Sequence, residues 1–273
     1  MGATQGRENE RTKEAKMLGT AIRRNIPSFL LTTLVGVVLM VIAIFTVANS
    51  YSVYYRIQIW MIAVPVFSMT YPLLSSAPFC WRFFYERKDG YLRYTANRYP
   101  LKRYVVESFV ASGLLVFLCI FIISFSSAII SLFLISPQTD ISKNVPAFEK
   151  ELFGLVLLNN PVLYSFVLSL WRGVLGELYF IFGFVLSLFY NNILIVMTAP
   201  FVYSILENFT MSMLGCPQNS IITSFMPTRL ASGYTALYNL FVGPAVLIGI
   251  TGLLFLKEYT KRRKEPGRCL NII

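Results

Sequence analysis

Side chains that could carry out chemistry are scarce in this chain of 273 residues, and their types exclude several kinds of active site. There is no histidine, so the chain lacks the commonest general base of enzymes and a common ligand of catalytic zinc. The only aspartates, Asp89 and Asp140, fall in polar stretches, and the four cysteines have no close spacing. A membrane-embedded hydrolase or lipid transferase needs convergent acids, bases or metal ligands, and the chain offers few of them.

Three charged residues fall inside apolar stretches: Arg172, Glu177 and Glu207. Charge at membrane depth is costly, so such residues are candidates for function. We expect them toward the outer half of the membrane, with Arg172 paired to a glutamate or part of a polar patch at an outer gate or pathway. The alternative is structural, with Arg172 reaching to the headgroups and the glutamates capping packing contacts between helices.

The chain has no motif for ATP hydrolysis. No lysine follows a glycine, so the phosphate-binding loop G-x-x-x-x-G-K-[ST] is absent from the sequence. We therefore expect no enzymatic activity and no cofactor or metal bound by this chain itself.

The elements that hold these residues are indicated by composition. Hydrophobic residues make up 56% of the chain and charged residues 14%, whereas soluble domains carry about 25% charged residues. The apolar runs are continuous and long enough to cross a bilayer, which favours helices over a β-barrel. The sequence predicts an all-α membrane protein with one domain over residues 1–273. Its six predicted spans are residues 28–48, 58–80, 104–135, 172–190, 193–213 and 237–256.

The net charge of +11 is concentrated beside the spans. Residues 1–28, 79–104 and 257–268 hold six, seven and six of the 24 lysines and arginines. This is the positive-inside pattern, so we expect both termini in the cytoplasm and the protein in the bacterial cytoplasmic membrane. No soluble module carries a basic face, which argues against nucleic acid and leaves membrane lipids as a partner.

The amino-terminal segment, residues 1–27, is predicted to be a cytoplasmic tail that ends in an amphipathic interfacial helix over residues 13–26. Pro27 then permits a turn into the membrane domain, residues 28–256. The alternative is a helix that simply extends the first span. Residues 257–273 form a basic cytoplasmic tail.

Two segments are expected on the outer side. Residues 152–171 are assigned mainly to surface or partly inserted helix, because a seventh span would place the basic tail outside. Residues 214–236 are expected to dip back into the bilayer as short re-entrant helices.

The most charged stretch lies between the second and third spans and contains "ERKDGYLRYTANRYPLKRY". Glu86 ends the second span, Gly90 can end a helix, and Pro100 can begin the next one. Residues 91–99 between them read as a short amphipathic helix. Such a segment can transmit force to a partner, although a basic loop that only fixes topology has the same composition.

This stretch resembles the first cytoplasmic loop of type-2 ATP-binding-cassette (ABC) exporter permeases. That loop begins with a glutamate, has a glycine four residues later, and continues through a coupling helix to a proline or basic turn. Glu86 and Gly90 match. Pro100 lies one residue further from the glycine than is common, and Glu107 stands near a position often held by lysine.

The resemblance implies a half-transporter that pairs with a second permease copy or a related chain. Two separate nucleotide-binding subunits would bind ATP and magnesium and drive alternating access for export. The aromatic content of 15% suits an amphipathic, lipid-like or peptide cargo. An ion-coupled carrier and a membrane scaffold without an ATPase remain alternatives. The resemblance assigns the ATPase contact to Glu86, Arg87, Gly90, Tyr91, Arg93, Tyr94, Arg98 and Pro100.

Overall fold

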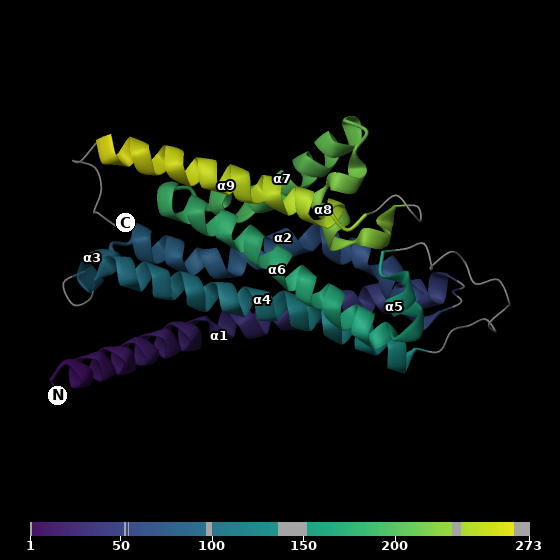
Figure 1. Cartoon of the computed structure of the whole chain (residues 1–273), viewed down its shortest axis with the longest axis horizontal. Helices are drawn as coiled ribbons and strands as arrows, with labels where there is room; N and C mark the ends of the chain where they lie inside the picture. The colour runs from purple at the N-terminus through teal and green to yellow at the C-terminus, as the bar shows by residue number, and fades with distance from the viewer. Residues whose placement is uncertain are drawn as a thin grey trace.

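Six long helices, each long and apolar enough to cross a membrane, make up the computed structural model (Figure 1). The structure describes residues 2–51, 53, 55–96, 100–135, 152–230 and 236–264, and these contain no strand. The predicted all-α architecture with six apolar spans is therefore confirmed. The long helices are α1 (Gly2–Ser50), α2 (Arg56–Lys88), α4 (Leu101–Leu134), α6 (Pro161–Phe189), α7 (Ile193–Met213) and α9 (Asn239–Lys264).

The connections contain short helices. α3 (Tyr91–Ala96) lies between α2 and α4, and α5 (Gly154–Asn159) precedes α6. Between α7 and α9 lie η2 (Pro217–Asn219), α8 (Ile221–Phe225) and η3 (Pro227–Arg229), which agrees with the short helices expected in that outer segment.

The described parts of the three basic blocks lie at one end of the bundle. Figure 1 places the start of α1, α3 and the end of α9 together on the left, while α5 and α8 lie at the other end. We call the first of these the basic end and the other the opposite end. The even number of spans places the start of α1 and the end of α9 at the same end of the bundle.

The centre of the bundle is formed by α2, α4 and α6, which pack against one another. α1 packs on α2 and α4, whereas α7 packs on α2 and α6, and α9 packs on α6 and α8. The core is rich in aromatic rings from α2, α6 and α8, among them Phe67, Tyr71, Tyr179 and Phe225, all buried.

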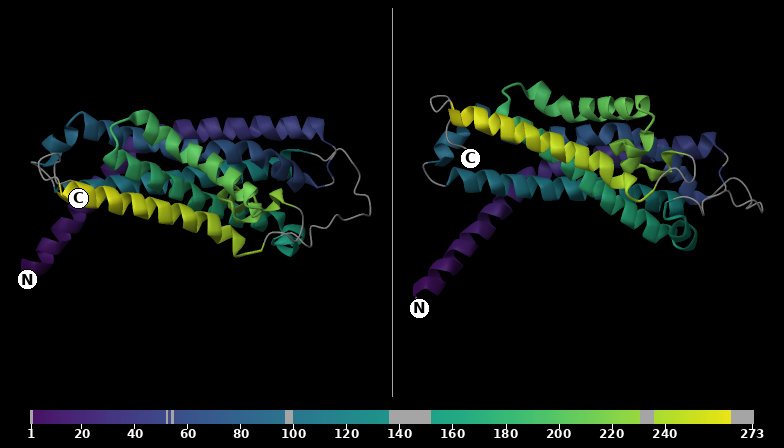
Figure 2. Two further views of the ribbon diagram at one scale, coloured as in Figure 1. Left: turned by 90° about the horizontal axis from the view of Figure 1, so that it is seen from above. Right: turned by 45° about the horizontal axis from the view of Figure 1, so that its top comes forward.

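α1 runs through Pro27 without a break, so the predicted turn there is wrong and the alternative, a helix that extends the first span, is observed. Proline removes one backbone donor and disturbs the preceding turn of a helix. Here Arg82 Nη1 donates to the carbonyl oxygen of Arg24 at 2.5 Å, in that turn. A neighbouring helix thus supplies a donor beside the proline, as is common in membrane helices. The first part of α1 extends away from the bundle (Figure 2).

The fourth span begins at Pro161, not near residue 172 as predicted. Residues 161–171 belong to the same helix as the rest of the span, and only α5 is a separate short helix before it. The Asn160 side chain accepts a hydrogen bond from the Leu163 N–H at 3.1 Å, and Pro161 occupies the first turn. Both are favourable signals for a helix start, and no breaker follows them.

Candidate functional site

α2 and α4 are connected by one short helix, α3, as the sequence predicts. α2 ends at Lys88, and Gly90 adopts φ 77°, the left-handed conformation in which a glycine commonly ends a helix. α3 follows directly. Pro100, with φ −59°, then precedes the first residue of α4.

α3 presents two aromatic side chains to its surroundings. Tyr94 is 78% exposed and Tyr91 is 45% exposed, while Leu92 is buried and holds the short helix to the bundle. Exposed aromatic side chains of this kind are common anchors of protein interfaces. Among the other residues predicted for this contact, Arg98 and the side chain of Arg93 lie outside the described part of the chain.

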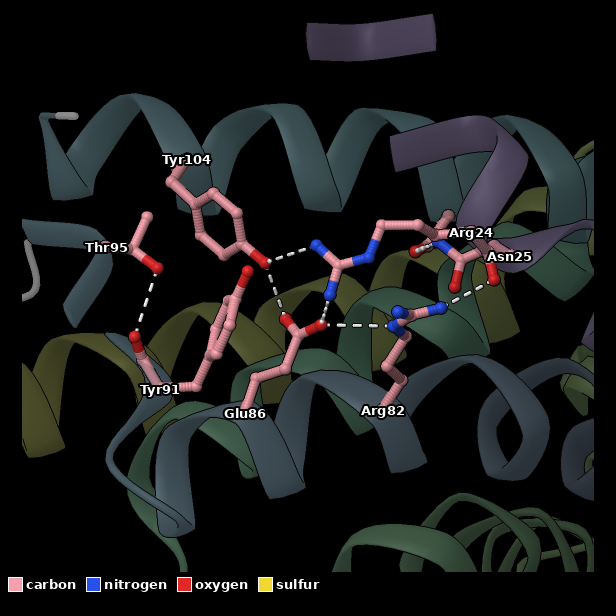
Figure 3. Close-up of polar contacts among 8 residues, drawn as sticks. Arg24, Asn25, Arg82, Glu86, Tyr91, Thr95 and Tyr104 are labelled. Carbon is pink, nitrogen blue, oxygen red and sulfur yellow. Dashed lines mark hydrogen bonds and ion pairs between the residues drawn. The ribbon is translucent and has the colours of Figure 1, made fainter. Parts of the chain in front are cut away.

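Glu86 points into the bundle instead of toward the exposed face of α3 (Figure 3). Its Oε1 accepts from Arg24 Nη2 at 2.6 Å and from Arg82 Nε at 3.0 Å. Its Oε2 accepts from the Tyr104 hydroxyl at 2.8 Å, and only 13% of the side chain is exposed. Glu86 therefore joins α2 to α1 and α4 at the basic end.

Arg87 binds a different part of the bundle. Its Nη1 donates to the carbonyl oxygen of Leu188 at 2.7 Å, and its Nη2 donates to the carbonyl oxygen of Tyr190 and to Asn191 Oδ1. These acceptors lie at the end of α6 and in the turn to α7. A guanidinium is favourable there because the last carbonyls of a helix lack partners and carry partial negative charge.

The segment of residues 82–94, which ends α2 and begins α3, is thus tied to three other spans, α1, α4 and α6, and to the turn between α6 and α7. Arg24 also lies over the ring of Tyr91, with Cζ 5.6 Å from the ring centroid, and so connects α1 to α3. The sequence did not identify Arg24 or Tyr104, because their partners are distant in sequence. Arg82 could have been found, since it lies four residues before Glu86 on the same helix face.

Arg172 lies toward the opposite end of the bundle, and only 2% of it is exposed. It is therefore buried among the helices and does not reach out to the lipid headgroups, which was the predicted alternative. Its Nε donates to the carbonyl oxygen of Phe225 at 3.0 Å, and its Nη1 donates to Ser124 Oγ at 2.9 Å. The guanidinium also lies over the rings of Trp60 and Phe225, at 4.4 and 4.9 Å from their centroids. Arg172 thereby fixes the last residue of α8 to α2, α4 and α6.

Glu207 is buried and fixes the other end of α8. Its carboxylate accepts from the Ser220 hydroxyl at 2.9 Å and from the Ile221 N–H at 3.1 Å. A carboxylate at the start of a helix and a guanidinium at its end both match the helix dipole. Glu207 thus behaves as the predicted structural alternative, a cap on a packing contact.

The predicted ion pair between Arg172 and a glutamate is not found among the described residues. Glu177 lies apart from α8, on the face of α6 that meets α4. A Cβ placed on Gly113 would lie 3.3 Å from its Oε1. The structure therefore brings Arg172 and Glu207 together around α8 and leaves Glu177 outside this cluster.

Comparisons of the chain with protein-family models, with curated proteins and with solved structures find no match. The candidate site is therefore interpreted from its own geometry. It has two parts: residues 82–94 at the basic end and α8, held between Arg172 and Glu207, at the other end.

Proposed function

We propose that this chain is the membrane subunit of an ATP-driven exporter of the type-2 ABC permease kind. Separate nucleotide-binding subunits would bind ATP and magnesium, and a second permease chain would complete the pathway. The cargo class that suits the aromatic interior is amphipathic, lipid-like or peptide. The observation that carries the proposal is that the exposed short helix α3 directly follows the end of α2, where Glu86 and Arg87 contact α1, α4, α6 and the turn between α6 and α7.

The force path follows from these contacts. By the charge rule the basic end faces the cytoplasm, where an ATPase subunit can dock on the exposed face of α3. Closure of the ATPase would push on Tyr91 and Tyr94. Glu86 would pass the movement to α1 and α4, and Arg87 would pass it to the turn between α6 and α7. The work of this chain is conformational, and hydrolysis belongs to the partner.

The opposite end supplies a gate in this proposal. All five residues of α8 are buried, and Phe225 stacks on Tyr71 of α2 with ring centroids 4.0 Å apart. The two charged contacts that hold α8 come from different spans, Arg172 from α6 and Glu207 from α7. A relative movement of α6 and α7 would therefore loosen α8 at one of its ends and open the outer side.

Purification of the full chain in mild detergent, with identification of bound proteins and an ATPase assay, tests the proposal. We expect an ATPase subunit in fixed stoichiometry that is lost in Gly90→Pro and weakened in Tyr94→Ala. Proline cannot adopt the positive φ of Gly90, and Tyr94 is the most exposed of the described side chains of α3. The matched control is Tyr238→Ala, which removes a tyrosine that is 69% exposed near the start of α9.

A chain that purifies alone as a stable oligomer, with both variants indistinguishable from the parent, would contradict the exporter. That outcome would favour a carrier or a scaffold. Transport that persists without ATP and stops when an ion gradient is removed would identify the carrier.

A further inference from the structure

A polar crevice opens between α1, α2 and α4 at the basic end, beside the carboxylate of Glu86. Its enclosed volume is about 20 Å³, room for about one water-sized oxygen atom, and its mouth is open. The polar side chains that line it include those of Arg24, Asn25, Arg82, Glu86, Tyr104 and Ser108. Figure 3 shows both arginines directed toward the single carboxylate.

The crevice carries an excess of positive charge. Two guanidiniums, those of Arg24 and Arg82, share the one carboxylate of Glu86, which leaves one net positive charge. Donors also remain. Among the hydrogen bonds of the described residues, none involves Arg24 Nε, Arg82 Nη2 or Ser108 Oγ, and all three belong to residues that line the crevice. A cationic crevice with unused N–H and O–H donors matches the chemistry of a phosphate oxygen.

The level at which the crevice lies relative to the membrane points to a lipid. Trp81 is adjacent to Arg82 and 53% exposed, and tryptophans of membrane proteins gather at the level of the headgroups. The apolar stretch of α2 ends at the same level. A phosphate at this depth is most abundant as part of a phospholipid headgroup, and the surrounding lysines and arginines disfavour a headgroup that also carries a cation.

We propose that this crevice binds the phosphate group of an anionic phospholipid from the leaflet at the basic end. The proposal does not depend on the exporter function. Glu86 repels the phosphate and competes with it for Arg24 and Arg82, so the bound lipid and the ion pairs of Glu86 exchange with one another.

The experiment is lipid retention by the purified full chain, measured by native mass spectrometry. Phosphatidylglycerol and phosphatidylcholine with the same acyl chains are titrated in parallel. We expect preferential retention of phosphatidylglycerol. Arg82→Gln should weaken it about fivefold, since one basic side chain near an anionic surface is worth about that factor. Glu86→Gln should strengthen it, because the competing carboxylate is removed.

Two further variants make the test specific. Ser108→Leu narrows the crevice and leaves every ion pair in place. It should therefore lower lipid retention in a chain that folds normally, which keeps the test valid if Arg82→Gln fails to fold. Arg56→Gln at the opposite end is the matched control and should have no effect. Equal retention of the two lipids, or unchanged retention in both Ser108→Leu and Arg82→Gln, would overturn the proposal. Displacement of the lipid by millimolar inorganic phosphate alone would also overturn it and assign the crevice to free phosphate.

Discussion

Glu86 and Arg87 are neighbours in the sequence, yet their side chains bind opposite parts of the bundle. Glu86 accepts hydrogen bonds from Arg24 of α1 and Tyr104 of α4, while Arg87 donates to carbonyl oxygens at the end of α6 and in the turn that follows. Successive side chains of a helix point about 100° apart, so two adjacent residues can reach two sides. The end of α2 is thereby fixed to both halves of the bundle just before Gly90.

The ion pair between Arg24 and Glu86 should stabilise the fold measurably. Glu86→Gln should lower the free energy of unfolding more than Arg24→Gln does, because it leaves two arginines without their carboxylate. Arg24→Gln keeps the ion pair between Arg82 and Glu86. We expect a coupling free energy of about 1 kcal/mol for the pair, since both side chains are half-buried and close. The measurement is a double-mutant cycle on thermal unfolding in detergent.

The control for this cycle is Arg103→Gln with Glu107→Gln, a more loosely spaced pair of α4 at 3.6 Å. Its coupling should be smaller. Equal coupling in the two cycles would show that Glu86 has no special role in joining the helices.

Arg87 should hold the turn between α6 and α7 through the shape of its guanidinium. Arg87→Lys keeps the charge but cannot bind several oxygens in a fixed fork. We expect the backbone amides of residues 190–192 to exchange hydrogen about tenfold faster in Arg87→Lys, for a loss of ~1.5 kcal/mol. Hydrogen exchange followed by mass spectrometry measures this.

Lys88→Gln is the matched control, because Lys88 is the next residue and its side chain is exposed. Its exchange pattern in the α6–α7 turn should equal that of the parent chain. Protection of the turn that survives Arg87→Lys would mean that packing alone orders it.

The effect of a substitution at Gly90 should depend on how readily the new residue adopts a positive φ, and not on the size of its side chain. A Cβ on Gly90 meets nothing within 4 Å, so only its φ of 77° penalises a side chain. Gly90→Ala should cost about 1 kcal/mol, and Gly90→Asn less, because asparagine adopts this conformation more readily. Gly249→Ala is the control: its Cβ is equally unobstructed but the residue is helical, so the change should stabilise by about 0.5–1 kcal/mol. If Gly90→Ala were equally stabilising in a thermal melt, the positive φ would not matter.

The parts of the fold that depend on local sequence could be predicted. The six spans follow from runs of apolar residues, and the predicted fifth span, residues 193–213, has the bounds of α7. The break at Gly90 follows from glycine's conformational freedom. The early start of α6 was also visible in principle, since Asn160 before Pro161 is a favourable helix start.

The parts that depend on packing could not be predicted. Pro27 lies within α1, and Arg82 of another helix donates to the carbonyl of Arg24 in the preceding turn, a contact that no local pattern shows. Arg172 was recognised as a charge at membrane depth, but its acceptor is the backbone carbonyl of Phe225 and not a glutamate. Sequence identifies the side chain that needs a partner, whereas the partner follows from how the helices pack.

The two charged contacts of α8 should control access to it. Arg172→Gln shortens the side chain, so its hydrogen bond to the Phe225 carbonyl is lost, and it removes the cation above two rings. Glu207→Leu removes the acceptor for Ser220 and Ile221. Each change should let α8 leave the core more often.

The reporter is Ser224→Cys, a fully buried position of α8, in a chain where Cys216 and Cys269 are replaced by serine. We expect a membrane-impermeant thiol reagent to label this cysteine at least several-fold faster in Arg172→Gln and in Glu207→Leu. Glu177→Gln should leave the rate unchanged, because Glu177 lies outside the cluster around α8. If all three variants labelled alike, α8 would be held by its apolar contacts and the opposite charges at its ends would not form a gate.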